Sequence, residues 1–234
     1  MSNKIKFTKI NQEVLDEYAP TPAKNVLPDW YKKTPSYIND ISKVNFGKTV
    51  SSNGTIKRCM PVFDALTAGY IIPTPCDIVI RKMPNGSIEY HPTLSNLIHF
   101  HDIIQAPYHP SMNRLPYAKF ENPWSIQTPP GYSCLIMPPV HSTNTYFTIL
   151  EGVVDTDKFI VSVNFPFVLN DVNFNGVIPA GTPMAQVIPF KRESWKLELG
   201  NDNDISEINK NLSKLKTKVY DRYKGMFWSK KEFN

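Results

Sequence analysis

The sequence has 234 residues, a formal net charge of +5 and a hydrophobic fraction of 41%, with 21 prolines against ten glycines. This composition is typical of a globular protein with a real core, and no apolar stretch approaches the eighteen residues that a membrane span needs. Because proline lacks a backbone donor and disrupts helix interiors, the chain is expected to consist mainly of short strands and ordered loops.

The first third of the chain alternates turn signals with short apolar runs. Residues 5–10 are predicted to form a strand, and Pro28-Asp29-Trp30-Tyr31 is predicted to start a short helix. A second short helix is expected near residues 61–69, ending at Gly69. Residues 91–123 are expected to form a connector rich in histidine and proline.

A strand pair is expected next. The run IIPTPCDIVI, residues 71–80, is predicted to be a strand at a sheet edge or with a bulge, because it contains two prolines. Asn85-Gly86 is the strongest short hairpin signal in the chain and is predicted to pair this run with residues 87–91.

From residue 124 onward the sequence predicts a series of short strands. The segments are WSIQTP, YSCLIMPP, YFTILEGVV, FIVSVNFPFVL, NGVIPA, MAQVIPF and SWKLEL. Residues 177–190, VIPAGTPMAQVIPF, are predicted to form a hairpin. The regular spacing of turn residues favours an all-β barrel or sandwich.

An amphipathic helix is predicted near the C-terminus, followed by an apolar tail. Apolar residues recur there at three- and four-residue steps, at Ile205, Ile208, Leu212, Leu215 and Val219. We expect an N-terminal arm over residues 1–45, a single β-rich domain over 46–200, and a C-terminal helix with a docked tail over 201–234.

Three cysteines, Cys59, Cys76 and Cys134, are far apart in the sequence and lack metal-type spacing. They are predicted to be buried, reduced thiols. The N-terminal residues lack the apolar region of a secretory signal, so secretion by a signal peptide is not expected.

Three motifs in the β-rich region resemble the dUTPase and dCTP deaminase superfamily. They are Pro130-Gly131-Tyr132, then Gly152-Val153-Val154-Asp155 with Phe159, and finally Gly181 with Met184-Ala185-Gln186-Val187. The resemblance implies a β-clip fold and a trimer. It would make Asp155 a water-orienting carboxylate and Gln186 a contact to phosphate or backbone. Asp155 has a second interpretation as a turn residue bonded to its own backbone.

Where the superfamily carries an Arg-Ser-Gly phosphate segment, this sequence has Pro138-Pro139-Val140-His141, and the glycine-rich C-terminal arm is absent. Triphosphate binding needs cations or backbone N–H nests, which these positions do not offer. Nucleotide hydrolysis is therefore the alternative hypothesis and not the leading one.

Histidine clustering gives a third hypothesis. His99 and His101 alternate on one predicted strand and would share a face, with His141, His109 or Asp102 as a third ligand for a divalent metal. This arrangement would suit a metal-dependent, cupin-like β-barrel enzyme, although histidine is also common in aromatic loops. No other cofactor is predicted.

The whole chain resembles an uncharacterised domain family of marine T4-like phages and some bacteria. The resemblance rests on APTPAKNVLPDWYK, TIKRCMPVFDALTAGYIIP, GTPMAQVIPFKRE and the C-terminal FWSKK. It implies a viral-type protein of the host cytoplasm or virion. The leading hypothesis is a mainly β protein, a β-clip or jelly-roll-like barrel or sandwich, that acts by binding or assembly. It is expected to be a homo-oligomer with a nucleotide or viral protein as partner.

Overall fold

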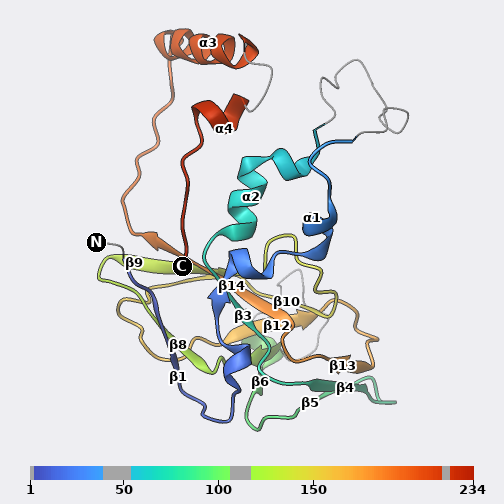
Figure 1. Ribbon diagram of the computed structural model, residues 1–234. Coiled ribbons are helices and arrows are strands. Elements are labelled where there is room, and N and C mark those ends of the chain that lie inside the picture. Colours follow the sequence, from blue (N-terminus) through green and yellow to red (C-terminus); the bar gives the residue numbers. More distant parts are fainter. Residues whose placement is uncertain (1–2, 39–53, 106–116, 218–221) are drawn as a thin grey trace. The chain divides into compact units, whose positions relative to one another are not determined.

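The structure, a computed structural model, describes residues 3–38, 54–105, 117–217 and 222–234, and Figure 1 shows their helices and strands. Within these ranges the chain forms two compact units. The first comprises Met1–Pro28, Leu66–Arg192 and Phe233–Asn234, and the second comprises Asp29–Ala65 and Glu193–Glu232. Each unit is built from segments that are far apart in the sequence.

The first unit contains the strands. In chain order they are β1 (Lys6–Lys9), β2 (Thr21–Pro22), β3 (Tyr70–Pro73), β4 (Ile78–Lys82), β5 (Ile88–Pro92), β6 (Ile98–His101), β7 (Tyr117–Phe120), β8 (Trp124–Gln127), β9 (Tyr132–Met137), β10 (Phe147–Ile149), β11 (Gly152–Val154), β12 (Phe165–Leu169), β13 (Gly176–Ile178) and β14 (Pro183–Lys191). Short 3-10 helices connect some of them, among them the turn Ala23–Val26.

All pairings between these strands are antiparallel. They form four sheets with the orders β1-β8, β10-β12-β7-β6, β11-β9-β14-β3-β2 and β13-β4-β5. The largest sheet has β14 at its centre, between β9 and β3 (Figure 1). Its position there places the sequence around Gln186 inside the fold.

Several strand predictions are confirmed. The strand predicted at residues 5–10 is β1, and the Asn85-Gly86 turn joins β4 to β5. Gly86 has φ +84°, and the N–H of Met83 donates to the carbonyl of Ser87 across the turn. The left-handed conformation at Gly86 is the reason that a glycine stands at this position.

Two pairing predictions are wrong. Residues 177–190 do not form a hairpin, because β13 pairs with β4 while β14 pairs with β3 and β9. Residues 71–80 are not one strand but two, β3 and β4, which belong to different sheets. In both cases the strands pair with partners that are distant in the sequence instead of with their neighbours.

The core of the first unit is aromatic and aliphatic. In β12 the side chains of Phe165, Phe167 and Leu169 are buried and alternate with half-buried ones, as the alternation of a strand requires. The rings of Phe120 and Phe167 stack with centroids 4.1 Å apart, and Phe147 meets Phe120 at 5.0 Å. This cluster joins strands β7, β10 and β12 of one sheet.

The second unit contains the helices α1 (Asp29–Lys33), α3 (Asp202–Thr217) and α4 (Arg222–Met226), while α2 (Met60–Thr67) begins in it. The predicted helix starts at Pro28-Asp29 and near residue 61 are confirmed as α1 and α2. Gly69 has φ +68° just beyond the end of α2. Gly225 lies inside α4 and does not end a helix.

The predicted strand SWKLEL is wrong. Residues 194–199 lie in no helix or strand and have no strand partner within the described part of the chain. Helix α3 confirms the predicted amphipathic helix, although Val219 lies outside the described residues. Further on, Trp228 Nε1 donates to both carboxylate oxygens of Asp64 at 3.0 Å, and Lys231 Nζ lies 2.6 Å from the same carboxylate.

The cysteine prediction is confirmed for two of three residues. Cys76 and Cys134 are buried, whereas Cys59 is exposed. Burial raises the pKa of the Cys134 thiol, which also accepts a hydrogen bond from the Thr156 hydroxyl at 3.3 Å. Cys59 follows a one-turn 3-10 helix, Ile56–Arg58, and this connector leaves its side chain at the surface.

The expected mainly β fold, with a short helix near residues 61–69 and an amphipathic helix near the C-terminus, is confirmed. None of the helices in the described ranges has the length and apolar character needed to cross a lipid bilayer.

Replacing Phe167 by Ala is expected to lower the free energy of unfolding by about 3–5 kcal/mol, because it leaves a cavity in the stacked aromatic cluster. The side chain of Phe167 is 1% exposed, whereas that of Phe159 is 49% exposed. Phe159→Ala is therefore the control and should change stability by less than about 1 kcal/mol. Urea unfolding followed by tryptophan fluorescence measures both, and equal losses would contradict the assignment of the core.

Candidate functional site

Three neighbouring strands carry the motifs that resemble the dUTPase superfamily. Gly131 lies in the turn before β9, Gly152–Val154 is β11, and Gln186 lies within β14. Strand β9 pairs with both of the others. The structure therefore brings the three motifs into one sheet, and the site is built from their side chains.

An arginine that directly follows β14 organises one end of this sheet. Arg192 donates from both terminal guanidinium nitrogens to the carboxylate of Asp157, with a distance of 2.8 Å for the Nη1 contact. The backbone N–H of Gly131 donates to the same carboxylate at 2.8 Å. The Asp157 side chain is only 5% exposed, so this is a two-pronged salt bridge shielded from water.

The charges of this pair stabilise each other. The Arg192 guanidinium holds the pKa of the Asp157 carboxyl well below its usual range, and the backbone N–H of Gly131 acts in the same direction. The Asp157 carboxylate in turn raises the pKa of Arg192. Because the N–H of Arg192 also donates to the Gly131 carbonyl at 2.8 Å, the end of β14 is tied to the turn before β9.

Asp155 lies beside this salt bridge and follows β11 directly. Its Oδ1 accepts a hydrogen bond from the Ser133 hydroxyl at 2.6 Å and one from Arg192 Nη1 at 3.2 Å. Its backbone carbonyl accepts from the N–H groups of Lys158 and Phe159. The side chain is 52% exposed, so Asp155 offers a carboxylate that solvent can reach; its side-chain partners are Ser133 and Arg192, and the bonds to the following turn go to its backbone carbonyl.

The arrangement favours a structural clamp over an anion site. One guanidinium faces two carboxylates, and Arg192 Nη1 is further occupied by the carbonyl of Tyr132 at 2.9 Å and the hydroxyl of Ser133 at 3.0 Å. A triphosphate would have to compete with Asp157 for the same cation. The carboxylate of Asp155 is the group here that is open to an added ligand or water.

Gln186 is buried in the centre of the sheet, with 1% of its surface exposed. Its Oε1 accepts from the backbone N–H of Val140 at 2.8 Å, and its Nε2 donates to the carbonyl of Ala68 at 2.7 Å. The amide thereby joins β14 to the loop after β9 and to the end of α2. A lone amide in an apolar strand serves here to satisfy two backbone groups that would otherwise be buried without partners.

Gln186 and Asp155 do not share a site. Gln186 pairs with Met137 on β9, whereas Asp155 bonds to Ser133 on the same strand. Four residues of a strand span about 13 Å. The cavity beside Gln186 has a volume of about 40 Å³, which suits a few water molecules and not a nucleotide.

The predicted metal ligands are dispersed. His99 on β6 bonds through Nε2 to the Glu121 carboxylate at 2.8 Å, and His101 lies two residues further on the same strand. His141 lies in the loop after β9 with φ +51°. Among the residues that the structure describes, no group of three or more His, Cys, Asp or Glu side chains could hold a metal ion.

Of the other two candidate third ligands, Asp102 lies within the described residues and His109 does not. Asp102 Oδ1 accepts from the backbone N–H of Ile104 at 3.0 Å, which makes it a turn residue. His109 lies outside the described residues.

Arg192 and Asp157 are the residues that sequence reasoning missed. Both lie next to predicted motif residues, Asp157 two positions after Asp155 and Arg192 just beyond the strand of Gln186. The sequence offered one indication of this salt bridge, which is the opposite charge of two residues that follow predicted strands. The order of β11, β9 and β14 in the sheet is needed to show that these two strand ends meet.

No protein-family model matches the chain, and no curated protein matches it. The chain is similar to solved dUTPase structures. The dUTPase of Staphylococcus bacteriophage 80alpha is 11% identical with a TM-score of 0.37, and the match covers 86% of this chain and 90% of that one. The dUTPase of phage phi11 of S. aureus is 12% identical with a TM-score of 0.38, covering 86% and 98%. EIAV dUTPase is 12% identical with a TM-score of 0.31, covering 58% and 85%.

Replacing Gln186 by Ala is expected to lower the free energy of unfolding by about 2–4 kcal/mol, because the N–H of Val140 and the carbonyl of Ala68 lose a buried partner. Gln127→Ala is the matched control, since Gln127 lies on β8 with an exposed side chain, and should cost less than about 1 kcal/mol. Urea unfolding at pH 7 measures both. A Gln186→Ala variant as stable as the wild type would exclude the bridging role.

Asp157→Asn is expected to reduce stability at neutral pH and to flatten the acid side of the stability profile. The folded-state pKa of Asp157 lies below the value of about 3.9 in the unfolded chain. The stabilisation is therefore present above the unfolded pKa and is lost as the pH falls through the folded one. Urea midpoints measured from pH 7 to pH 2 should converge with those of the wild type at the acid end.

Asp29→Asn serves as the control, because its carboxylate is 72% exposed and lies 3.7 Å from Lys32. Its profile should parallel that of the wild type. A constant difference between wild type and Asp157→Asn at every pH would show that the salt bridge does not set the acid limit of stability.

Proposed function

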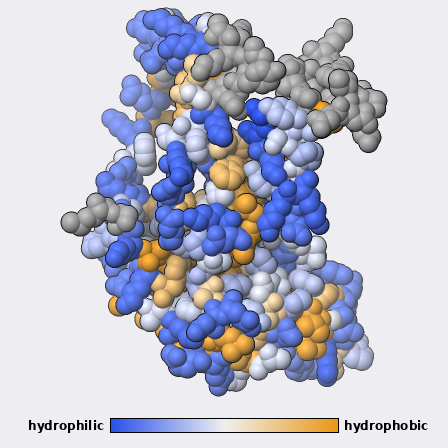
Figure 2. Space-filling view, in the orientation of Figure 1, coloured by the Kyte–Doolittle hydropathy of each residue, from blue (hydrophilic) through white to orange (hydrophobic). Residues whose placement is uncertain are grey.

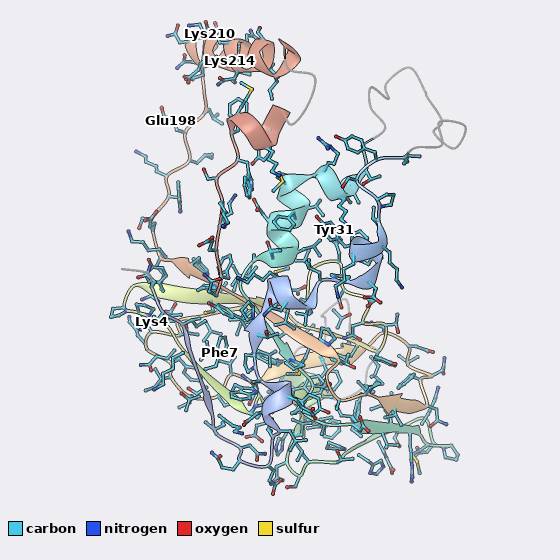
Figure 3. The ribbon with its side chains drawn as sticks, viewed as in Figure 1. Lys4, Phe7, Tyr31, Glu198, Lys210 and Lys214 are labelled. Carbon is cyan, nitrogen blue, oxygen red and sulfur yellow. The ribbon has the colours of Figure 1, made fainter. Side chains whose placement is uncertain are left out.

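We propose that the chain is a viral-type binding or assembly protein without enzymatic activity, which acts through apolar side chains exposed along residues 193–217. The observation that carries this proposal is the exposure of Trp195, Leu197 and Leu199, which are 89%, 87% and 84% exposed. Figure 3 shows the extended segment that carries them, in which Glu198 is labelled.

These three side chains alternate with Lys196 and Glu198, so one side of the extended segment is apolar and the other is charged. Such alternation is typical of a strand with one buried face. A segment of this kind can add to the edge of a partner's sheet, where its backbone bonds give affinity and its apolar side chains give specificity. Trp is also enriched at protein interfaces.

The candidate catalytic residues support the non-enzymatic part of the proposal. The amide of Gln186 serves two backbone groups, and Arg192 faces Asp157 and Asp155. Neither arrangement leaves a cation for a triphosphate at the motif positions. We further propose that the protein is a homo-oligomer, and a trimer if its fold is a β-clip. Its proposed location is the host cytoplasm or the virion.

A second candidate function is nucleotide handling of the dUTPase type, centred on Asp155. The observation that favours it is the exposure of this carboxylate beside the Ser133 hydroxyl. An exposed carboxylate held by a hydroxyl and a guanidinium can orient a water molecule.

The test of the enzymatic alternative incubates the full chain with each deoxynucleoside triphosphate and with Mg²⁺, Mn²⁺ or Zn²⁺. We expect no release of phosphate or pyrophosphate and no rise in the thermal midpoint, since a ligand that binds only the folded state must raise it. Turnover that is lost in Asp155→Ala but kept in Glu151→Ala, at the exposed residue before β11, would overturn the proposal. If metal alone raises the thermal midpoint of the wild type but not that of His99→Ala, the metal-dependent alternative would be favoured.

The test of the binding function compares the full chain with a variant carrying Trp195→Ser, Leu197→Ser and Leu199→Ser. We expect light scattering to give a mass above one chain for the wild type and a lower mass for the variant. The thermal midpoint of the variant should be unchanged, since these side chains are exposed. Equal masses for both would contradict the role of this segment in assembly.

A further inference from the structure

Helix α3 (Asp202–Thr217) carries its apolar residues in a narrow row. Ile205, Ile208, Leu212 and Leu215 follow one another at steps of three, four and three residues. This spacing is the a/d repeat of a coiled-coil seam, narrower than the stripe of a helix that packs on a globular core. The surface of α3 visible in Figure 2 is mainly hydrophilic, as expected for a helix with a single apolar row.

Three of the four seam side chains are exposed to solvent, and Leu215 is half-buried. Ile205 is 52% exposed, Ile208 is 55% exposed and Leu212 is 46% exposed. A 16-residue helix is marginally stable in water by itself, and most helical stability in proteins comes from packing of the apolar face. Helix α3 also contains several Asn and Ser residues, which are weaker helix formers. A surface that covers the seam would therefore stabilise the helix as well as bury its apolar side chains.

We propose that a second copy of this chain covers the seam, with the two α3 helices packed antiparallel. This inference names the partner in the assembly function proposed above and rests on it. The apolar row is symmetric about Lys210, because Ile205 and Leu215 lie five residues to either side of it, and Ile208 and Leu212 lie two residues to either side. In an antiparallel pair, Ile205 of one copy meets Leu215 of the other, and Ile208 meets Leu212.

The charges along α3 select the antiparallel direction. Asp202, Asp204 and Glu207 lie before the centre of the row, Lys210 lies at the centre, and Lys214 and Lys216 follow it in the sequence; Figure 3 labels Lys210 and Lys214. Antiparallel packing places the acidic half of one helix beside the basic half of the other, whereas parallel packing places like charges together. The helix dipoles favour the same direction. The surface is thus self-complementary, as a two-fold interface requires.

The interface is small, because each copy contributes four apolar side chains along one helix. An interface of this size is expected to be weak and transient. Association should therefore depend on protein concentration.

The first experiment measures the mass of the full chain by light scattering over a range of concentrations. The wild type should reach twice the mass of the seam variant Ile208→Glu/Leu212→Glu. The matched control Ser206→Glu/Ser213→Glu adds the same two charges at exposed positions beside the seam and should keep the wild-type mass. A wild type with the mass of one chain at every concentration, or a seam variant with the wild-type mass, overturns the proposal.

The second experiment measures the orientation with a spin label on Asn203→Cys in a Cys59→Ser background, since Cys59 is exposed. Residue 203 lies seven residues before Lys210, so two labels in an antiparallel pair are separated by about 20 Å along the helix axis at 1.5 Å per residue. Residue 203 lies on the face opposite the seam, so labels in a parallel pair are separated only across the pair, by about 10 Å between the axes plus the outward reach of both side chains; a separation without the axial component would overturn the antiparallel arrangement.

Failure of this inference is distinguishable from failure of the proposed function. If the triple variant at Trp195, Leu197 and Leu199 has a lower mass than the wild type while the seam variant keeps the wild-type mass, the α3 pair is rejected. The proposed assembly function is kept in that case. Nucleotide turnover that depends on Asp155 removes the proposed function whatever the mass of the chain.

Discussion

The first unit depends on how β14 is held at the centre of its largest sheet. The amide of Gln186 links this strand to the N–H of Val140 and to the carbonyl of Ala68. Next to Ala68, the backbone of Gly69 approaches so closely that a Cβ built there would lie 2.0 Å from the carbonyl oxygen of Val187. Only glycine fits this contact, and its φ of +68° is one that glycine adopts without strain. The end of α2 and β14 thereby fix each other.

The same strand is fixed again at its far end, by Arg192. Its salt bridge to Asp157 joins the end of β14 to the turn that follows β11, and Gly131 donates to the same carboxylate. The hydrogen bonds and the salt bridge around the motifs that resemble a catalytic superfamily therefore hold β9, β11 and β14 together.

The sequence predicted what depends on local pattern and missed what depends on distant partners. Alternation gave the strand around Phe167, and Asn85-Gly86 gave a hairpin, because a short turn with a left-handed glycine largely determines its own geometry. The hairpin at residues 177–190 failed because Val177 pairs with Val79 and Gln186 with Ile71, both about a hundred residues away. Neither alternation nor turn residues encode a pairing at that separation. The partnership of Arg192 with Asp157 was hidden for the same reason.

The segment after Arg192 is the place where local pattern and structure disagree most. Residues 194–199 have the alternation of a strand, yet within the described residues they pair with none, and α3 presents a coiled-coil seam to solvent. In a minimally frustrated chain, the structure that a segment favours locally agrees with the structure that it adopts. Residues 194–199 and α3 are two successive segments whose apolar pattern has no partner within the described part of the single chain, so we look for the partner outside it. The proposed partner would supply it in both cases, because an added sheet edge would satisfy the first segment and a second helix the other. In that proposal, the apolar surface that a single chain leaves exposed is the surface that drives its assembly.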